Sequence, residues 1–68
     1  MERKIAERLI ASALALDPLL GEIDAIISQI PDEAERKSLT RTLGGIMGEQ
    51  FDLIRAVERE YPDLAEKD

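Results

Sequence analysis

Apolar residues recur along the chain with the alternating three- and four-residue spacing of a coiled-coil seam, in two runs separated by Pro31. This spacing places each run on one side of an α-helix. The first run consists of Leu9, Ala13, Leu16, Leu20, Ile23, Ile27 and Ile30. The second run consists of Leu39, Leu43, Ile46, Gln50, Leu53 and Val57. The pattern predicts an all-α fold, an antiparallel helical hairpin.

The two helices are predicted over residues 2–30 and 33–60, and residues 62–68 form a tail in which Leu64 to Asp68 are expected to be polar and frayed. Asp32 is a suitable N-cap for the second helix, and Glu35 completes a capping box. A chain of 68 residues has room for one small domain, so we expect a single helical-hairpin domain spanning all of it.

The dipeptide Asp17-Pro18 interrupts the first predicted helix and allows two interpretations. Asp17 could cap a new helix that has Pro18 at its first position. Alternatively, one long helix continues with a kink near Pro18. The seam residues Ala13, Leu16 and Leu20 stay in helical phase across the dipeptide, which favours the kinked helix.

An antiparallel hairpin that turns near Pro31 has a predictable pairing between its two helices. The expected partners are Leu20 with Leu43, Leu16 with Met47, Ala13 with Gln50, and Leu9 with Ile54. Opposite charges should meet at the open end of the hairpin. The basic residues there are Arg3, Lys4 and Arg8, and the acidic residues are Glu58, Glu60 and Asp63.

The apolar surface is wider than a two-helix seam can bury. Further apolar residues beside the seam are Ile5, Ile10, Leu14, Leu19, Ile26, Met47, Phe51 and Ile54. Packing two hairpins into a homodimeric four-helix bundle would cover them, and a groove for a partner helix is the other interpretation. The candidate interface residues are Leu16, Leu20, Leu43, Gly44, Ile46, Met47, Gly48, Gln50, Phe51 and Ile54.

Glycine and glutamine occupy unusual positions in the second helix. Gly44 and Gly48 share one face, where each costs about 1 kcal/mol relative to alanine. Close approach of another helix explains them, and a hinge is the alternative. Gln50 lies at a seam position, where an amide can fix register by pairing with its symmetry mate in a dimer.

The composition narrows the classes of function. The formal net charge of −6 disfavours binding to nucleic acid and allows a protein partner with a basic or an apolar helical surface. No apolar run approaches the roughly 20 residues that a membrane helix needs. With no cysteine or histidine, disulfides and zinc sites are unavailable to a small domain, and we expect a cytoplasmic protein that gains stability by association.

No residue makes a case for catalysis, cofactor binding or metal binding. The serine and threonine hydroxyls have no histidine base in the chain. We therefore expect a non-catalytic protein-binding or regulatory module that acts as a homodimeric helical bundle. An acidic neutralising protein of the immunity or antitoxin type is the alternative, and a dimeric RNA-binding hairpin is disfavoured by the net charge.

Overall fold

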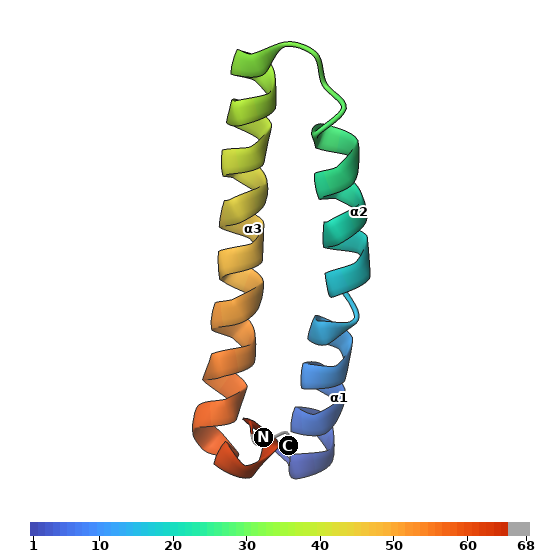
Figure 1. Ribbon diagram of the computed structural model, residues 1–68. Helices are drawn as coiled ribbons and strands as arrows, with labels where there is room; N and C mark the ends of the chain where they lie inside the picture. Colours follow the sequence, from blue (N-terminus) through green and yellow to red (C-terminus); the bar gives the residue numbers. More distant parts are fainter. Residues whose placement is uncertain (66–68) are drawn as a thin grey trace.

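The computed structural model describes residues 1–65 as a helical hairpin (Figure 1). The elements are α1 (Arg3–Leu14), α2 (Asp17–Ile27), α3 (Glu33–Glu60) and a short 3₁₀ helix, η1 (Pro62–Ala65). α1 and α2 together form the first arm of the hairpin, and α3 forms the second. The described part of the chain contains no strand, so the predicted all-α hairpin is confirmed.

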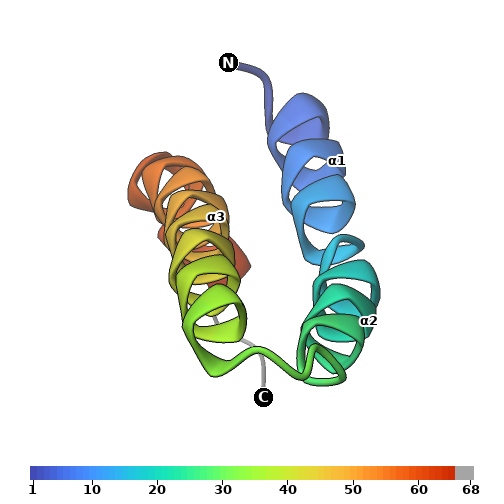
Figure 2. The same cartoon turned by 90° about the horizontal axis from the view of Figure 1, so that it is seen from above.

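The first arm bends at the junction between α1 and α2. Ala15 and Leu16 keep right-handed helical backbone angles, with φ of −65° and −73°. The amide of Leu20 donates to the carbonyl of Leu16 at 2.9 Å. Pro18 has no N–H to donate to Leu14, so the regular hydrogen-bond ladder is interrupted there. Figure 2 shows that α2 does not continue the line of α1, so the predicted kink is confirmed.

The turn of the hairpin begins earlier than predicted. α2 ends at Ile27, three residues before the expected end at residue 30. The amides of Gln29 and Ile30 donate to the carbonyls three residues before them, each at 3.0 Å, which is the geometry of a tightened last turn. Pro31 disfavours helical angles in the residue before it, and this restriction shortens the helix.

α3 begins and ends at the predicted residues, and its N-terminus is capped by a local side chain. The carboxylate of Asp32 accepts a hydrogen bond from the backbone N–H of Glu35 at 3.2 Å. Arg36 then donates from its guanidinium to the carbonyl of Ile30 at 2.8 Å. These two contacts fix the turn to the first helical turn of α3.

The core is a narrow line of apolar side chains between the two arms. The buried residues are Ala6, Ile10, Ala13, Leu20, Ile27, Leu43, Ile54 and Val57. Leu20, Ile27 and Leu43 form one cluster, which confirms the predicted pairing of Leu20 with Leu43. Ile10 and Ile54 were expected beside the seam, but both are buried.

The open end of the hairpin is closed by η1, so the prediction of a frayed tail is wrong for Leu64 and Ala65. Leu64 and Tyr61 pack against the second core cluster, whose buried members are Ala6, Ile10 and Val57. Because Tyr61 and Leu64 cover this cluster, the core extends to the open end of the hairpin and includes Ile10. The remainder of the predicted tail, residues 66–68, lies outside the described residues.

Hydrogen bonds join the two ends of the described chain. Arg3 donates from its guanidinium to the carboxylate of Asp63, and the hydroxyl of Tyr61 donates to the carbonyl of Met1. The hydrogen bond from Arg3 lowers the pKa of Asp63 below its ordinary value, although desolvation opposes the shift. Of the three basic residues expected at this end, Arg3 makes the predicted ion pair with Asp63.

Candidate interaction surface

Each arm carries two apolar stripes, and the hairpin buries one of them. The stripes that face the other arm repeat every seven residues, with Ala6, Ala13, Leu20 and Ile27 on the first arm and Leu43, Gln50 and Val57 on α3. The second stripes lie three residues further along, with Leu9, Leu16, Ile23 and Ile30 on the first arm and Leu39, Ile46 and Leu53 on α3. Leu9 and Ile30, at the two ends of the first arm, are half-buried against the core, and the other five residues are exposed.

The two exposed stripes lie on the same side of the hairpin. A step of three residues rotates a position by about 60° around an α-helix, because each residue turns by about 100°. The two arms run in opposite directions. Viewed from one end of the hairpin, a step of three residues therefore rotates the position clockwise on one arm and anticlockwise on the other. Both rotations therefore point toward one side of the plane that contains the arms.

This side of the hairpin is an apolar face of seven large side chains. Its members are Leu16, Leu19, Ile23, Ile26, Leu39, Ile46 and Leu53, which are 41–59% exposed. Leu19 and Ile26 extend the face along the outer flank of α2. Seven large apolar side chains exposed on one side of a small domain are typical of a binding face.

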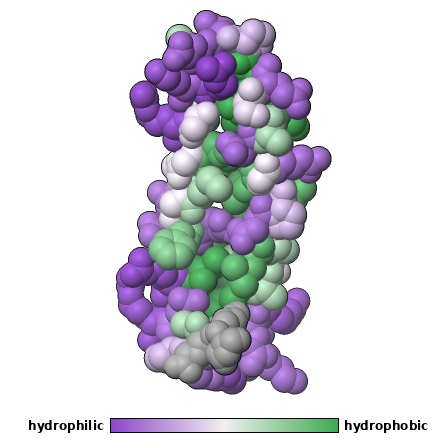
Figure 3. Space-filling view, in the orientation of Figure 1, coloured by the Kyte–Doolittle hydropathy of each residue, from purple (hydrophilic) through white to green (hydrophobic). Residues whose placement is uncertain are grey.

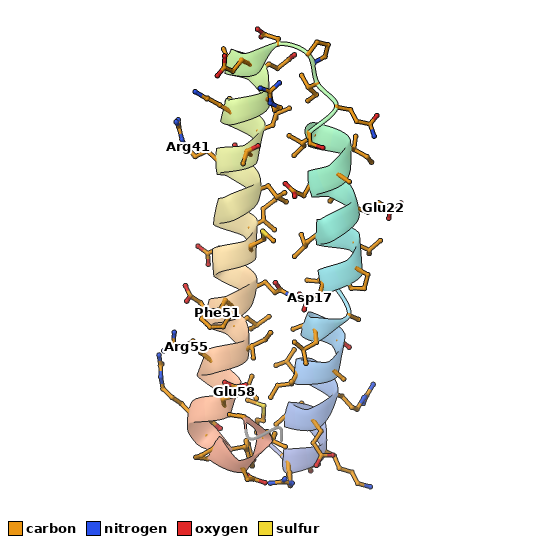
Figure 4. All side chains as sticks on the ribbon, viewed as in Figure 1. Asp17, Glu22, Arg41, Phe51, Arg55 and Glu58 are labelled. Carbon is orange, nitrogen blue, oxygen red and sulfur yellow. The ribbon has the colours of Figure 1, made fainter. Side chains whose placement is uncertain are left out.

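The opposite side of the hairpin has a different character, and we call it the glycine face. It carries Gly44, Met47, Gly48 and Phe51 on α3 and Leu14 on α1. Figure 4 shows the ring of Phe51 on this side, and Figure 3 shows the same side as a mixture of purple, pale and green residues. The guanidinium of Arg55 lies 5.1 Å from the centre of the Phe51 ring.

No neighbouring group of the hairpin occupies the space beside the glycines. Apart from its chain neighbours and the backbone of its own helix, a methyl group built at Gly44 or Gly48 would meet no atom within 4 Å. The close helix approach predicted for these residues therefore does not occur between the two arms. They remain bare backbone on the exposed surface of α3.

Gln50 has partners within its own chain, because it sits opposite the bend in the first arm. Its Nε2 atom donates to the carbonyl of Ala13 at 2.7 Å and to the carboxylate of Asp17 at 2.8 Å. The predicted pairing of Ala13 with Gln50 across the hairpin is thus confirmed. Figure 4 shows Asp17 at the junction, directed toward α3. The amide ties the end of α1 and the start of α2 to α3, and it needs no symmetry mate to be satisfied.

A concave region lies between α2 and α3 near the turn. It is a cleft of about 480 Å³ lined by Asp24, Ser28, Arg36, Lys37, Thr40 and Arg41. Its cations are already engaged or turned outward: Arg36 bonds to Ile30, and Lys37 pairs with Glu33 at 3.2 Å. Arg41 extends away from α2 in Figure 4. The cationic groups therefore do not converge on one point.

The structure divides the ten predicted interface residues among three environments. Leu20, Leu43 and Ile54 are core residues, with the partly buried Gln50 beside them. Leu16 and Ile46 belong to the apolar face. Gly44, Met47, Gly48 and Phe51 lie on the glycine face. The expected contact between Leu16 and Met47 is therefore wrong, because each is 42% exposed and they lie on opposite sides.

The predicted interface omitted most of the apolar face. Leu19, Ile23, Ile26, Leu39 and Leu53 were not among the candidate residues, although they are 41–59% exposed. The heptad spacing contained the signal, since Ile23, Leu39 and Leu53 are themselves seam residues. The spacing alone did not show which of the two stripes the hairpin uses for its own core.

In comparisons with known proteins, no family model, curated protein or solved structure matches the chain. Among residues 1–65, no three acidic side chains lie close enough together to hold a metal ion. None of the helices in this part of the chain has the length and apolar character needed to cross a bilayer. The apolar face is the strongest functional feature of the described residues.

Proposed function

We propose that this chain is a non-catalytic protein-binding module that acts as a homodimeric four-helix bundle, with the apolar face as the contact between two copies. The observation that carries the proposal is the exposure of seven large apolar side chains on one side of the hairpin. Covering such a face with an identical face removes it from water in both chains.

The thin core of the hairpin supports association. Two of its eight buried residues are alanines, and no large side chain among the described residues is completely buried. A domain of this size gains only a few kcal/mol from a single core. Burying the second stripes against a second copy would complete the heptad pattern, with both stripes of each helix facing the centre of the bundle.

The glycine faces point outward in this dimer, on its two opposite sides. Each offers Phe51, Met47 and bare helix backbone beside the cation of Arg55. These surfaces are available to a protein partner with an apolar helical surface. The proposed module thus has one face for self-association and two identical outer faces for binding.

Sedimentation equilibrium tests the self-association. We expect the wild-type chain to sediment at twice its monomer mass of 7.6 kDa at micromolar concentration. Ile46→Asp should produce monomers, because it places a charge in the middle of the apolar face. Phe51→Asp is the matched control: it makes the same kind of change on the same helix at a comparably exposed side chain, 56% against 49%. It should leave the dimer intact. A wild-type monomer with a cooperative melt, or equal effects of the two substitutions, would contradict the proposal.

A further inference from the structure

We infer that the two copies of the proposed dimer stack with their turns at opposite ends, so that the first arm packs against the first arm of the second copy and α3 packs against α3. This geometry rests on the proposed function, because it places a second copy on the apolar face. The observation that carries it is a difference between the two arms in the residues that border this face.

Symmetry leaves two ways to place two apolar faces together. A two-fold axis parallel to the helices keeps both turns at one end and sets each first arm against α3 of the second copy. A two-fold axis across the helices puts the turns at opposite ends and sets each arm against its own counterpart. The second stripes are buried in both arrangements, so the residues beside them decide.

The two arms differ in the column of residues that borders the second stripe on its outer side. The residues four before and three after each stripe residue form this column, because both steps lead to the same flank of an α-helix. On the first arm the column has three large apolar side chains, 50–59% exposed, and consists of Ile5, Ser12, Leu19 and Ile26. On α3 it has no large apolar side chain and consists of Glu35, Thr42, Glu49 and Ala56.

The apolar column of the first arm needs an apolar surface to cover it. With the turns at one end, it would lie against the polar column of α3 in the second copy, which carries Glu35 and Glu49. Placing a carboxylate against hydrocarbon without a hydrogen-bond partner is costly. With the turns at opposite ends, the apolar columns of the two first arms cover each other. The polar columns of the two α3 helices then meet at the rim, where water still reaches the carboxylates.

Contacts between the arms show which residues lie at the same level along the hairpin. Gln50 bonds to Ala13, and Leu43 packs with Leu20, so each step forward on one arm is a step back on the other. Leu16 and Ile46 therefore share a level in the middle of the apolar face. A two-fold axis across the helices at this level gives the largest overlap of the second stripes.

This axis brings the remaining residues of the second stripes together. Ile23 then lies level with Leu9 of the second copy, and Leu39 lies level with Leu53. Each Glu49 lies beside Thr42 of the second copy, about 3 Å away along the axis. The apolar layers and the polar columns are thus both in register.

Charged residues further from the face do not decide between the arrangements, because each arrangement offers them opposite charges. With the turns at one end, Arg8 lies within about one helical turn of Asp52 of the second copy. With the turns at opposite ends, Arg59 lies level with Glu35 of the second copy. The choice therefore depends on the apolar column.

The resulting contact is large enough for a stable dimer. Ile5 joins the seven residues of the apolar face, and it lies level with the segment between Ile26 and Ile30 of the second copy. Eight apolar side chains that are each about half exposed present on the order of 700 Å² per copy, close to the roughly 800 Å² per partner of a standard interface.

Ser12 and Thr42 offer a matched pair of positions for a test. Each is an exposed residue with a small polar side chain, four residues before the central stripe residue of its arm. With the turns at opposite ends, Ser12 lies between Leu19 and Ile23 of the second copy, and Thr42 lies beside Glu49. With the turns at one end, the neighbours are exchanged: Ser12 lies beside Glu49 of the second copy, and Thr42 lies beside Leu19.

Ser12→Lys should raise the dissociation constant of the dimer by about tenfold, because the ammonium meets apolar side chains of the second copy at two symmetric positions. Thr42→Lys should leave the constant within about threefold of the wild type, because the same ammonium meets Glu49. Sedimentation equilibrium measures both constants, with Ile46→Asp as the monomeric reference. The reverse order of effects, or equal effects of the two substitutions, would overturn this stacking and leave the dimer standing. A monomeric wild type would overturn both.

The position of the turns gives a second measurement that does not depend on affinity. The chain has no cysteine, so Gln29→Cys introduces a unique site for a spin label beside the turn. With the turns at opposite ends, the two labels should lie about 40 Å apart, counted from a rise of 1.5 Å per residue, which is close to the 46 Å length of the hairpin. A distance below half of that length would show both turns at one end and overturn the inference.

Discussion

Gln50 shows how a single polar side chain can join three helical segments. Its Nε2 atom donates to Ala13 at the end of α1 and to Asp17 at the start of α2, from a position in the middle of α3. An amide is suited to this site because it supplies two N–H donors to two oxygen acceptors. A seam glutamine therefore stabilises the bend that Pro18 introduces in the opposite arm.

Gln50→Glu should destabilise the protein at neutral pH by about 1–3 kcal/mol. The new carboxylate cannot donate to Ala13 and faces the carboxylate of Asp17, so its pKa in the folded state should lie above the unfolded value. The loss should then shrink as the pH falls and the carboxyl becomes protonated. Thermal unfolding across a pH series measures this. Gln29→Glu makes the same change at an exposed site and should show no comparable loss. A pH-independent effect at position 50 would contradict the assigned hydrogen bonds.

Asp63→Asn tests the ion pair at the open end. The pKa of Asp63 is lowered in the folded protein by its hydrogen bond from Arg3, so this contact stabilises the fold above the ordinary pKa of an aspartate. That stabilisation is lost as the pH falls through the lowered pKa. We expect a small drop in melting temperature at pH 7 and a smaller drop at about pH 2, below the ordinary pKa of an aspartate. A difference of the same size at both pH values would exclude this charge effect.

Local interactions determine where the helices end. The packing of the two arms against each other determines which face of each helix is buried and which is exposed. The carboxylate of Asp32 fixes the start of α3, and Pro31 shortens α2. α3 is 28 residues long, yet it contacts the first arm along only one of its two apolar stripes. Gly44 and Gly48 lie on its other side, where no group of the hairpin packs against them.

Replacing Gly44 and Gly48 together by alanine should stabilise the protein by about 2 kcal/mol, because alanine has the higher helix propensity and both methyl groups enter open space. Dimerisation through the apolar face should not change. The melting temperature and the sedimentation mass of the double variant measure the two effects. Lower stability with weaker dimerisation would show that the glycines lie in the interface between copies, as their spacing suggests, and would exclude the apolar face as the whole contact.

The whole molecule is an elongated hairpin, 46 Å long, whose core is one line of side chains thick. Such a shape leaves much apolar surface in contact with water. In the proposed dimer, folding and association are therefore coupled, and the stability of each copy depends on the concentration of the other.

The melting temperature should consequently fall on dilution. A dimer that dissociates as it unfolds becomes less stable as the protein concentration decreases, whereas a monomer shows no such dependence. Circular dichroism melts over about two decades of concentration, with a van't Hoff analysis, measure this. Ile46→Asp provides the reference, because its melting temperature should be both lower and independent of concentration.

The heptad spacing and the turn residues determined the helical hairpin, the bend at Pro18, both ends of α3 and the pairing of Leu20 with Leu43. These features depend on local backbone preferences and on a period that any helix must obey. The sequence also showed that the apolar surface exceeds what two helices can bury. Only the tertiary structure decided which stripe became core, because both stripes have the same seven-residue spacing and both carry large apolar residues. It also placed Leu16 and Met47 on opposite sides, buried Ile10 and Ile54, and gave Gln50 partners on the first arm. Each of these outcomes depends on how each arm is rotated about its own axis relative to the other. Side-chain packing between the arms determines this rotation, and the spacing of apolar residues does not.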